Sequence, residues 1–360
     1  MTKILGLETS CDETAAAIVE DGWRVCANVV ATQHKLHERY RGVVPEIASR
    51  AHLENISPVI HETLQKAGLE LADVDAIAVG HRPGLIGSLL VGVSAAKALA
   101  WSLNKPLIGV DHVRAHLHAA VLQTEPTDEA EMEPIRFPAL GLVVSGGHSN
   151  LYAMHNESEL EPIGSTIDDA IGEAYDKAAV ILDLGYPGGP RLDKLAQEGD
   201  SEAYELPRSM LGPDSLDFSF SGLKTAVLYT VRGHPIGRGK SARFERSADD
   251  LSDKQKADIA ASFQQAAVDT VMLKLQRAID FMADRGEKPR SLVIGGGVSA
   301  NSLLRQRSIE LGEILGLEVR IPEFAYCLDN AAMIAGLAYS AYQQGRFDGL
   351  DLPAMASGTL

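Results

Sequence analysis

One local pattern occurs twice in the chain, and it constrains the fold more than any other feature. Residues 4–19 and residues 140–154 each show a strand, a polar loop and a returning strand. Two such hairpins in the two halves of a chain indicate an internal duplication. A chain of 360 residues is also too long for one small core and suits two domains. The sequence therefore predicts an α/β protein built from two similar halves.

The boundaries of these halves follow from composition along the chain. We expect a first domain over 1–123 and a second over 136–328, separated by an acidic stretch that contains proline. A last helix over 329–345 is expected to pack near the first domain. The stretch 232–249 has no clear periodicity and interrupts the second domain as an insertion.

Composition excludes several classes of protein. Hydrophobic residues make up 45% of the chain and charged residues 23%, which is typical of soluble globular proteins. No apolar run reaches the length of a membrane span, and the N-terminus has no signal-peptide pattern. Three cysteines argue against a disulfide framework and for the reducing cytoplasm. A formal charge of −16 argues against nucleic-acid binding driven by net charge alone.

A pair of histidines is the clearest candidate for a metal site. The apolar run 107–110 reads as a buried strand that turns directly into a helix carrying His112 and His116. Residues four apart lie on one helical face, so both imidazoles can bind one divalent metal. Two hydrogen-bonded histidines without a metal are the alternative. Asp329, which follows a distant strand, favours the metal site. A zinc peptidase needs Glu directly after the first histidine, where this chain has Val113.

Four loops carry further polar or glycine-rich patterns. The loop 9–14 holds Asp12 and Glu13, either as an acidic site or as an ordinary polar hairpin. The glycines of 295–301 come after a strand and before a helix, which fits a phosphate-binding loop or only a tight turn. We expect a rigid turn over 185–190 and a loop packed on the core over 216–224.

The insertion is locally basic. Its stretch 232–247 contains four arginines and a lysine against one glutamate, a local charge of +4 in an acidic protein. It is either a solvated loop or an arm that contacts phosphates of a nucleic acid through Arg238, Lys240 and Arg243.

Ten short motifs, in order along nearly the whole chain, resemble those of the tRNA N6-adenosine threonylcarbamoyltransferases, the TsaD family. The motifs are ETSCDET (8–14), RGVVPEIASRAH (41–52), PGLIGSLLVG (83–92), DHVRAH (111–116), VVSGGH (143–148), IDDAIGEAYDKAA (167–179), YPGGP (186–190), DFSFSGLKTA (217–226), GGGVSANSLLR (295–305) and CLDNAAMIA (327–335). Two positions depart from the family pattern: Arg114 stands where Glu is usual, and His81-Arg82 replaces the usual residues before PGL.

The resemblance implies the actin-like, sugar-kinase-like (ASKHA) ATPase fold, with two duplicated domains around a central cleft. It implies transfer of threonylcarbamoyl from threonylcarbamoyl-AMP to N6 of adenosine 37 in tRNAs that read ANN codons. The product is t6A, and AMP is released. It further implies one iron or zinc ion per subunit, an ATP or AMP moiety in the cleft, and TsaB- and TsaE-like partners if the source is bacterial. No membrane partner is expected.

The resemblance also assigns residues to roles. It implies metal ligands at His112, His116 and Asp329, and it places Asp12 and Glu13 near the chemistry as candidate proton acceptors. It implies substrate-binding positions at Val143, Val144, Ser145, Gly146, Gly147, Asp176, Gly189, Asp193 and Asn301. The alternative functions are a regulatory or chaperone-like ATPase on the same fold and, more weakly, a metalloprotease. A plain ATPase of this fold does not need the paired histidines.

Overall fold

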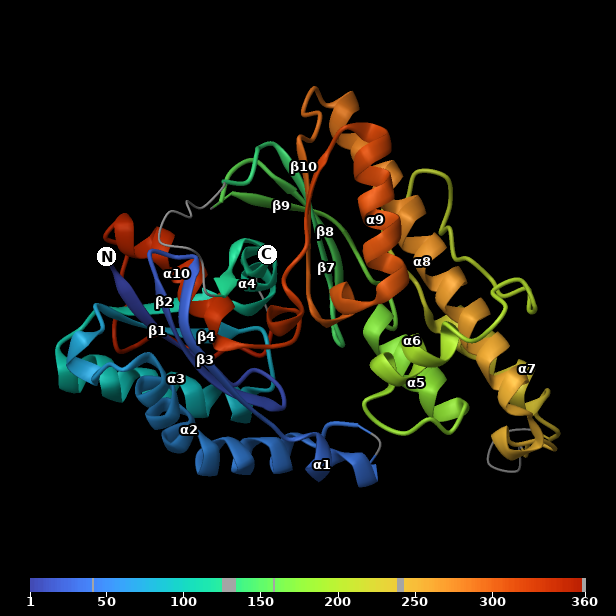
Figure 1. The fold of residues 1–360 in the computed structure, drawn as a ribbon, viewed down its shortest axis with the longest axis horizontal. Coiled ribbons are helices and arrows are strands. Elements are labelled where there is room, and N and C mark those ends of the chain that lie inside the picture. The colour runs from blue at the N-terminus through green and yellow to red at the C-terminus, as the bar shows by residue number, and fades with distance from the viewer. Residues whose placement is uncertain (41, 125–133, 158, 238–242, 358–360) are drawn as a thin grey trace.

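Two β-sheets with one shared strand order form the framework of the protein (Figure 1). The computed structural model describes residues 1–360 except 41, 125–133, 158, 238–242 and 358–360. The first sheet has the order β5-β4-β1-β2-β3-β6, and the second has the order β11-β10-β7-β8-β9. In each sheet, three consecutive strands pair antiparallel (β1-β2-β3 and β7-β8-β9). Two further strands then pair in parallel beside the first of these three: β4 and β5 beside β1, and β10 and β11 beside β7. The predicted duplicated α/β fold is therefore confirmed.

The strands are short and largely buried, as the apolar runs predict. The first sheet contains β1 (Lys3–Glu8), β2 (Glu13–Glu20), β3 (Arg24–Thr32), β4 (Ala76–Arg82), β5 (Leu107–Asp111) and β6 (Gln123–Thr124). The second contains β7 (Ala139–Val144), β8 (Ser149–Met154), β9 (Leu160–Ser165), β10 (Ser291–Gly295) and β11 (Glu318–Arg320).

Helices cover both faces of the first sheet. On one face lie α2 (Pro45–Ala67) and α3 (Ile86–Leu103), and on the other lies α10 (Ala331–Gln343). The short helix α1 (His34–His37) follows β3. Proline stands at the first position of α2, and Gly68, with φ 65°, follows its end, as is usual at the two limits of a helix. By length and composition alone, α3 is apolar enough to cross a membrane, but it packs on the sheet through buried residues such as Val93.

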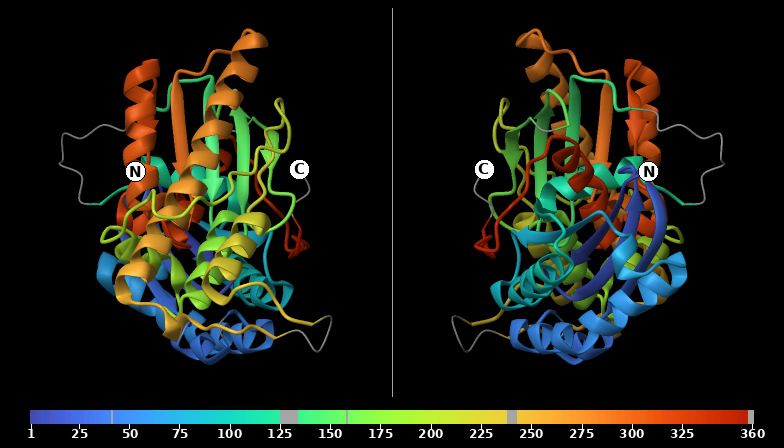
Figure 2. Two further views of the ribbon diagram at one scale, coloured as in Figure 1. Left: turned by 90° about the vertical axis from the view of Figure 1, so that its right-hand side faces the viewer. Right: turned by 90° about the vertical axis from the view of Figure 1, so that its left-hand side faces the viewer.

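The second sheet carries a larger helical layer on its outer face, which the side views show (Figure 2). Its members are α5 (Ile171–Ile181), α6 (Gly188–Ala196), α7 (Ser221–Arg232), α8 (Asp253–Asp284) and α9 (Ser302–Leu315). The aromatic side chains of Tyr175, Phe218 and Phe263 are buried in this layer. A capping box begins the long helix α8: Ser252 Oγ accepts a hydrogen bond from the backbone N–H of Gln255, and the side-chain oxygen of Gln255 accepts one from the backbone N–H of Ser252.

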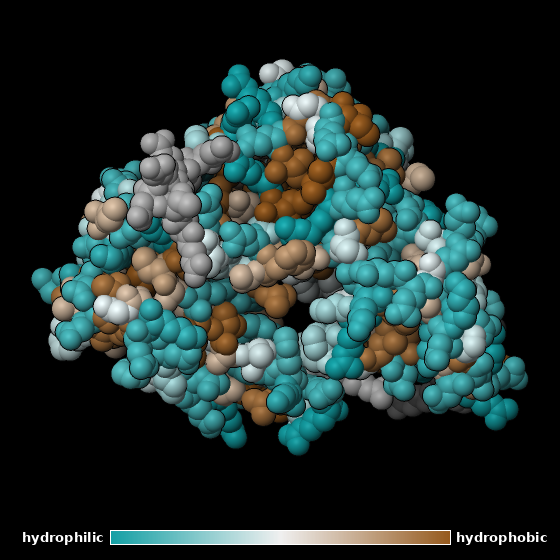
Figure 3. Space-filling view, in the orientation of Figure 1, coloured by the Kyte–Doolittle hydropathy of each residue, from teal (hydrophilic) through white to brown (hydrophobic). Residues whose placement is uncertain are grey.

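The short helix α4 (His112–His118) joins the two halves. Val113 and Leu117 pack against the second sheet, whereas Ala115 belongs to the cluster between the first sheet and α10. A third face of α4 therefore remains for the two histidines. The space-filling view shows the surface hollowed between the halves (Figure 3).

Three elements differ from the sequence-based expectations. Strand β9 was not predicted. Helix α6 begins at Gly188, inside the segment predicted as a turn, and α7 begins at Ser221, inside the segment predicted as a loop. Both helices start where a distant aspartate accepts hydrogen bonds from their first amides, so the signal that begins them is tertiary.

Candidate metal centre and cleft

His112, His116 and Asp329 come together at the junction of the two halves. The Asp111 carboxylate caps α4 and fixes the turn that starts with His112, while Asp329 immediately precedes Asn330, the N-cap of α10. Oδ1 of Asp329 lies 3.3 Å from Nε2 of His116 and 3.6 Å from Nε2 of His112. One potential ligand atom from each residue lies within 4.8 Å of the other two.

The electrostatics of this cluster favour a bound cation. Although burial opposes it, the Asp329 and Glu8 carboxylates raise the pKa of His112 to about 9. Burial also opposes ionisation of Asp329, but His112 and His116 hold its pKa well below the usual range. Burial lowers the pKa of His116, and neither of its ring nitrogens has a hydrogen-bond partner among the described residues. A metal ion held beside Asp329 would give Nε2 of His116 a partner, so the residues fit the predicted group.

Two further residues hold His112, and the sequence analysis missed both. Nδ1 of His112 lies 3.1 Å from Oε2 of Glu8 and 3.2 Å from Oγ of Ser10. These contacts leave Nε2 to face Asp329, which is how carboxylates commonly orient metal-binding histidines. The Glu8 carboxylate is fully buried at the carboxyl end of β1, which no pattern in the sequence indicated. Gly80 makes room for it, since a Cβ there would lie 2.5 Å from Oε2 of Glu8.

The glycine loop after β7 brings the second half to this centre. Val143 and Val144 are fully buried strand residues, which leaves the loop 145–147 as the accessible part of the motif. The Ser145 amide donates to the carbonyl of His148, whose ring centroid lies 6.5 Å from that of His112. Gly146 and Gly147 are exposed, with open space where a side chain would be.

The acidic loop of the first half also lies at the cleft. Asp12 and Glu13 are buried, and Oε1 of Glu13 lies 3.3 Å from Nε2 of His34 in α1. Burial, followed by the charges of Asp12 and Asp329, raises the pKa of Glu13 well above its usual range. The His34 ring makes an edge contact with Tyr186 of the second half, with the centroids 5.8 Å apart.

The remaining predicted residues form a second group at the starts of α6 and α9. Oδ1 of Asp176 accepts hydrogen bonds from the amides of Gly188 (2.9 Å) and Gly189 (3.3 Å). The Asn301 amide nitrogen donates to Asp193 (3.0 Å) and to Gln264. Both hydrogens of this amide therefore have partners inside the protein, and Asn301 positions the Asp193 carboxylate.

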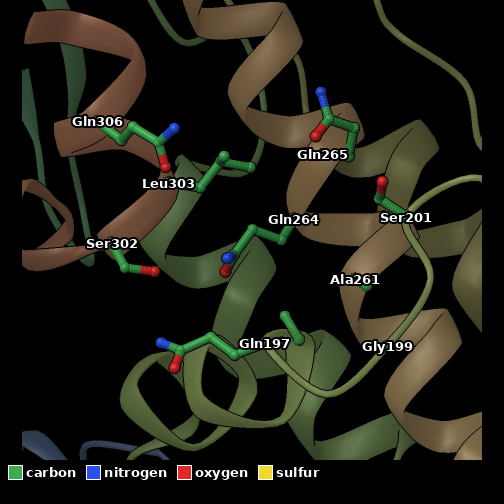
Figure 4. A pocket seen from close by; sticks show the side chains of 10 residues that line it. Gln197, Gly199, Ser201, Ala261, Gln264, Gln265, Ser302, Leu303 and Gln306 are labelled. Atoms are coloured by element: carbon green, nitrogen blue, oxygen red, sulfur yellow. The ribbon is translucent and has the colours of Figure 1, made fainter.

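A cavity of about 270 Å³ opens beside this group, between α6, α8 and α9. The amide of Gln264 and the hydroxyl of Ser302 point toward one another across it (Figure 4). Ser302 Oγ also donates to Asp193 at 2.7 Å. The lining is uncharged and rich in amides: Ala196, Gln197, Gly199, Ser201, Ala261, Gln264, Gln265, Ser302, Leu303 and Gln306.

The glycines before Asn301 have a packing role. A Cβ at Gly295 would lie 2.0 Å from the carbonyl oxygen of His116, and one at Gly296 would lie 2.4 Å from that of Val144. Gly296 also has φ 92°. These two glycines therefore fit the tight-turn interpretation of the motif, because neighbouring backbone occupies the space of a side chain.

Only part of the predicted basic arm can be placed. Arg238 and Lys240 lie outside the described residues. Arg232 is the last residue of α7, and Nη2 of Arg246 donates to the Thr230 carbonyl at 3.1 Å. At least these two cations of the insertion therefore lie on or against α7.

The departure from the family pattern at His81-Arg82 has structural partners. Nδ1 of His81 lies 2.9 Å from the carbonyl of Pro353, and Nε of Arg82 lies 3.4 Å from the Asp111 carboxylate. The segment before PGL thus contacts the C-terminal tail and the residue that caps α4.

Two repeated sheets around a cleft, with an acid–histidine centre at their junction, define an ASKHA-type protein with a candidate metal site. Solved structures agree with this fold. HypF of T. kodakarensis is 16% identical with a TM-score of 0.57, covering 98% of this chain and 49% of that one. Component A of the (R)-2-hydroxyglutaryl-CoA dehydratase of Acidaminococcus fermentans is 15% identical with a TM-score of 0.50, covering 96% of this chain and 99% of that one.

Sequence comparison identifies the family. The family model described as "TsaD: tRNA N6-adenosine threonylcarbamoyltransferase" matches residues 24–336. Relatives with that name are 47% identical in Moorella thermoacetica, over 98% of this chain and 96% of the relative, and 49% identical in Symbiobacterium thermophilum, over 98% and 95%. The chain belongs to the tRNA N6-adenosine threonylcarbamoyltransferase family. The predicted family and the predicted transferase class are thereby confirmed.

Proposed function

We propose that this chain transfers the threonylcarbamoyl group of threonylcarbamoyl-AMP to N6 of adenosine 37 in tRNAs that read ANN codons. The product is t6A, and AMP is released. The observation that carries the proposal is the meeting of His112, His116 and Asp329 beside the exposed glycines 146–147, in a chain of this family.

One iron or zinc ion, held by His112, His116 and Asp329, is part of the proposal. Two imidazoles and one carboxylate suit either metal. When bound, such an ion supplies Lewis-acid polarisation of a phosphate or carbonyl oxygen. Glu8 and Ser10 contact Nδ1 of His112 and so orient its ring, and the unpartnered Nε2 of His116 supports the assignment.

The chain's own groups suit the remaining chemistry. In the transfer, adenosine N6 forms a bond to the carbamoyl carbon, and the bond from that carbon to the phosphate oxygen of AMP breaks. Gly146 and Gly147 are exposed, and their amides suit donation to the oxygen that gains charge. Asp12 or Glu13 accepts the proton that N6 loses. The raised pKa of Glu13 suits that role, because it makes this carboxylate a stronger base.

We assign the adenosine of threonylcarbamoyl-AMP, or of ATP or AMP, to the group of residues around Asp193. Asp176 and Asp193 suit the hydroxyls of ribose, and the Gly189 amide lies beside them. The uncharged cavity lined by Gln264 and Ser302 offers amide and hydroxyl groups to a neutral base. Asn301 contributes by holding Asp193 and Gln264 in place.

We infer the tRNA and protein partners from the net charge of the chain and from its family. With a formal charge of −16, the chain needs local basic residues or helper proteins to bind tRNA. We assign the helpers to TsaB- and TsaE-like proteins and the location to the cytoplasm. The insertion that contains Arg238 and Lys240 is the candidate basic arm.

The test is mass spectrometry of tRNA nucleosides after incubation with threonylcarbamoyl-AMP, with and without the candidate partners. His112→Ala and His116→Ala should each lose the bound metal and abolish t6A formation, because each removes one of three ligands. Elemental analysis measures the metal, and circular dichroism checks the fold.

His61→Ala, a change at an exposed histidine of α2, is the matched control and should retain both metal and activity. Full metal occupancy in the His112 and His116 variants would refute the ligand assignment. ATP hydrolysis without any t6A would favour the regulatory ATPase instead.

A further inference from the structure

We propose that Asp12, Glu13 and His34 form a second divalent-cation site, distinct from the centre at His112, His116 and Asp329. One potential ligand atom from each of the three residues lies within 4.8 Å of the others. Asp12 comes from the turn between β1 and β2, Glu13 is the first residue of β2, and His34 is the first residue of α1. The Gln33 amide donates to the Asp12 carbonyl at 3.1 Å, which holds the two segments together.

An unsatisfied buried oxygen points to a ligand at this cluster. Asp12 is 6% exposed, and its Oδ2 has no hydrogen-bond partner among the residues that the structure describes. A buried carboxylate oxygen without a donor is costly, particularly beside a second carboxylate. The 3.3 Å contact between His34 and Glu13 leaves that oxygen unsatisfied. A cation would offset both negative charges and give Oδ2 a partner.

The donor set indicates the class of cation. Two carboxylate oxygens suit hard ions such as Mn²⁺ or Mg²⁺, while an imidazole nitrogen favours a transition metal. Mn²⁺ meets both preferences. Because three side chains do not complete its usual coordination, water or an oxygen of the substrate would fill the other positions.

The location of the cluster gives the cation a role. Tyr186 of the second half contacts the His34 ring. Asp176, which accepts hydrogen bonds from the Gly188 and Gly189 amides, lies near enough to Asp12 for the two charges to interact. The site therefore lies where the first half meets the nucleotide-binding group of the second. A cation there would hold the phosphate of the adenylate, and the carboxylate oxygens that do not bind it would remain to accept the proton from N6. This role rests on the proposed function, whereas cation binding itself does not.

The experiment measures Mn²⁺ binding to the metal-free chain by calorimetry and by electron paramagnetic resonance, without tRNA or nucleotide. The double variant His112→Ala/His116→Ala removes the first centre and should still bind one Mn²⁺. Adding His34→Leu to this background should weaken that binding by at least about tenfold. Asp12→Asn, which keeps the shape of the side chain, should do the same.

His61→Leu in the same background is the control and should bind Mn²⁺ as the double variant does. Thermal unfolding of every variant checks that the fold is retained. Absence of Mn²⁺ binding in a folded double variant would overturn the proposal, and so would unchanged affinity after His34→Leu. Failure of t6A formation alone would bear on the proposed function and leave the cation site intact.

Discussion

At the scale of single residues, the metal centre depends on a side chain that is not a ligand. Glu8 is fully buried, and its Oε2 lies 3.1 Å from Nδ1 of His112. It fixes the ring so that Nε2 faces Asp329. The geometry of the candidate metal centre therefore depends on the carboxyl end of β1 as well as on α4.

Glu8→Gln should lower the affinity for the metal by roughly 10- to 100-fold, because the amide no longer supplies a negative charge behind His112. Competition with a chromogenic chelator measures the change. Glu20→Gln, at a buried glutamate at the far end of β2, is the control and should bind metal normally. Equal affinities in the two variants would show that Glu8 has no part in the centre.

At the scale of elements, two helices begin at positions set by distant aspartates. Asp176 binds the first amides of α6, and Asp168 binds the amides of Phe220 and Ser221 at the start of α7. Hydroxyls of Ser219 and Ser221 also donate to Asp168. These carboxylates act as N-caps supplied from elsewhere in the chain.

Asp168→Ala should destabilise the protein by roughly 1 kcal/mol at neutral pH, the usual cost of losing a cap. Burial raises the pKa of Asp168, but hydrogen bonds from Ser219 and Ser221 outweigh it, so the pKa is lowered. A lowered folded-state pKa stabilises the protein above the unfolded pKa, about 4. The difference from the unaltered chain should therefore shrink as pH falls below this value and disappear as pH falls through the lowered folded-state pKa.

Urea unfolding at pH 7 and at pH 3 measures this effect. The exposed Asp214 offers a control, since Asp214→Ala should leave stability unchanged at both values of pH. A pH-independent loss in Asp168→Ala would contradict the capping role.

These elements also mark what the sequence could predict. Gly68 and the capping box at Ser252 are local signals, because the residues that mark the end of α2 and the start of α8 adjoin those helices in the sequence. The start of α7 depends on Asp168, more than fifty residues away, so no local pattern indicated it. The pairing of His112 and His116 was predictable because they share a helical face, whereas the contact of Glu8 with His112 was not, since it forms only when β1 and α4 meet.

At the scale of the whole molecule, the halves are joined through α4. Apolar residues of this helix pack on both sides, and the carbonyl of His116 lies against Gly295 of β10. No side chain fits at Gly295, because its Cβ would lie 2.0 Å from that carbonyl oxygen.

Gly295→Ala should therefore push α4 away from the second sheet. We expect a loss of stability of about 1–3 kcal/mol and weaker metal binding, as His116 moves with its helix. Chemical denaturation and metal titration measure the two effects. Gly222→Ala, where a Cβ meets open space, is the control and should change neither. Unaltered stability in Gly295→Ala would show that this contact tolerates a methyl group.

The positions of the three ligands along the chain have a consequence for folding. His112 and Asp329 are separated by 217 residues (329 − 112), and the whole second half lies between them. An ion bound to both closes that segment into a ring, much as a covalent cross-link does, and so reduces the conformational freedom of the unfolded chain. Unfolding of the two halves should then be more nearly a single transition with the ion than without it.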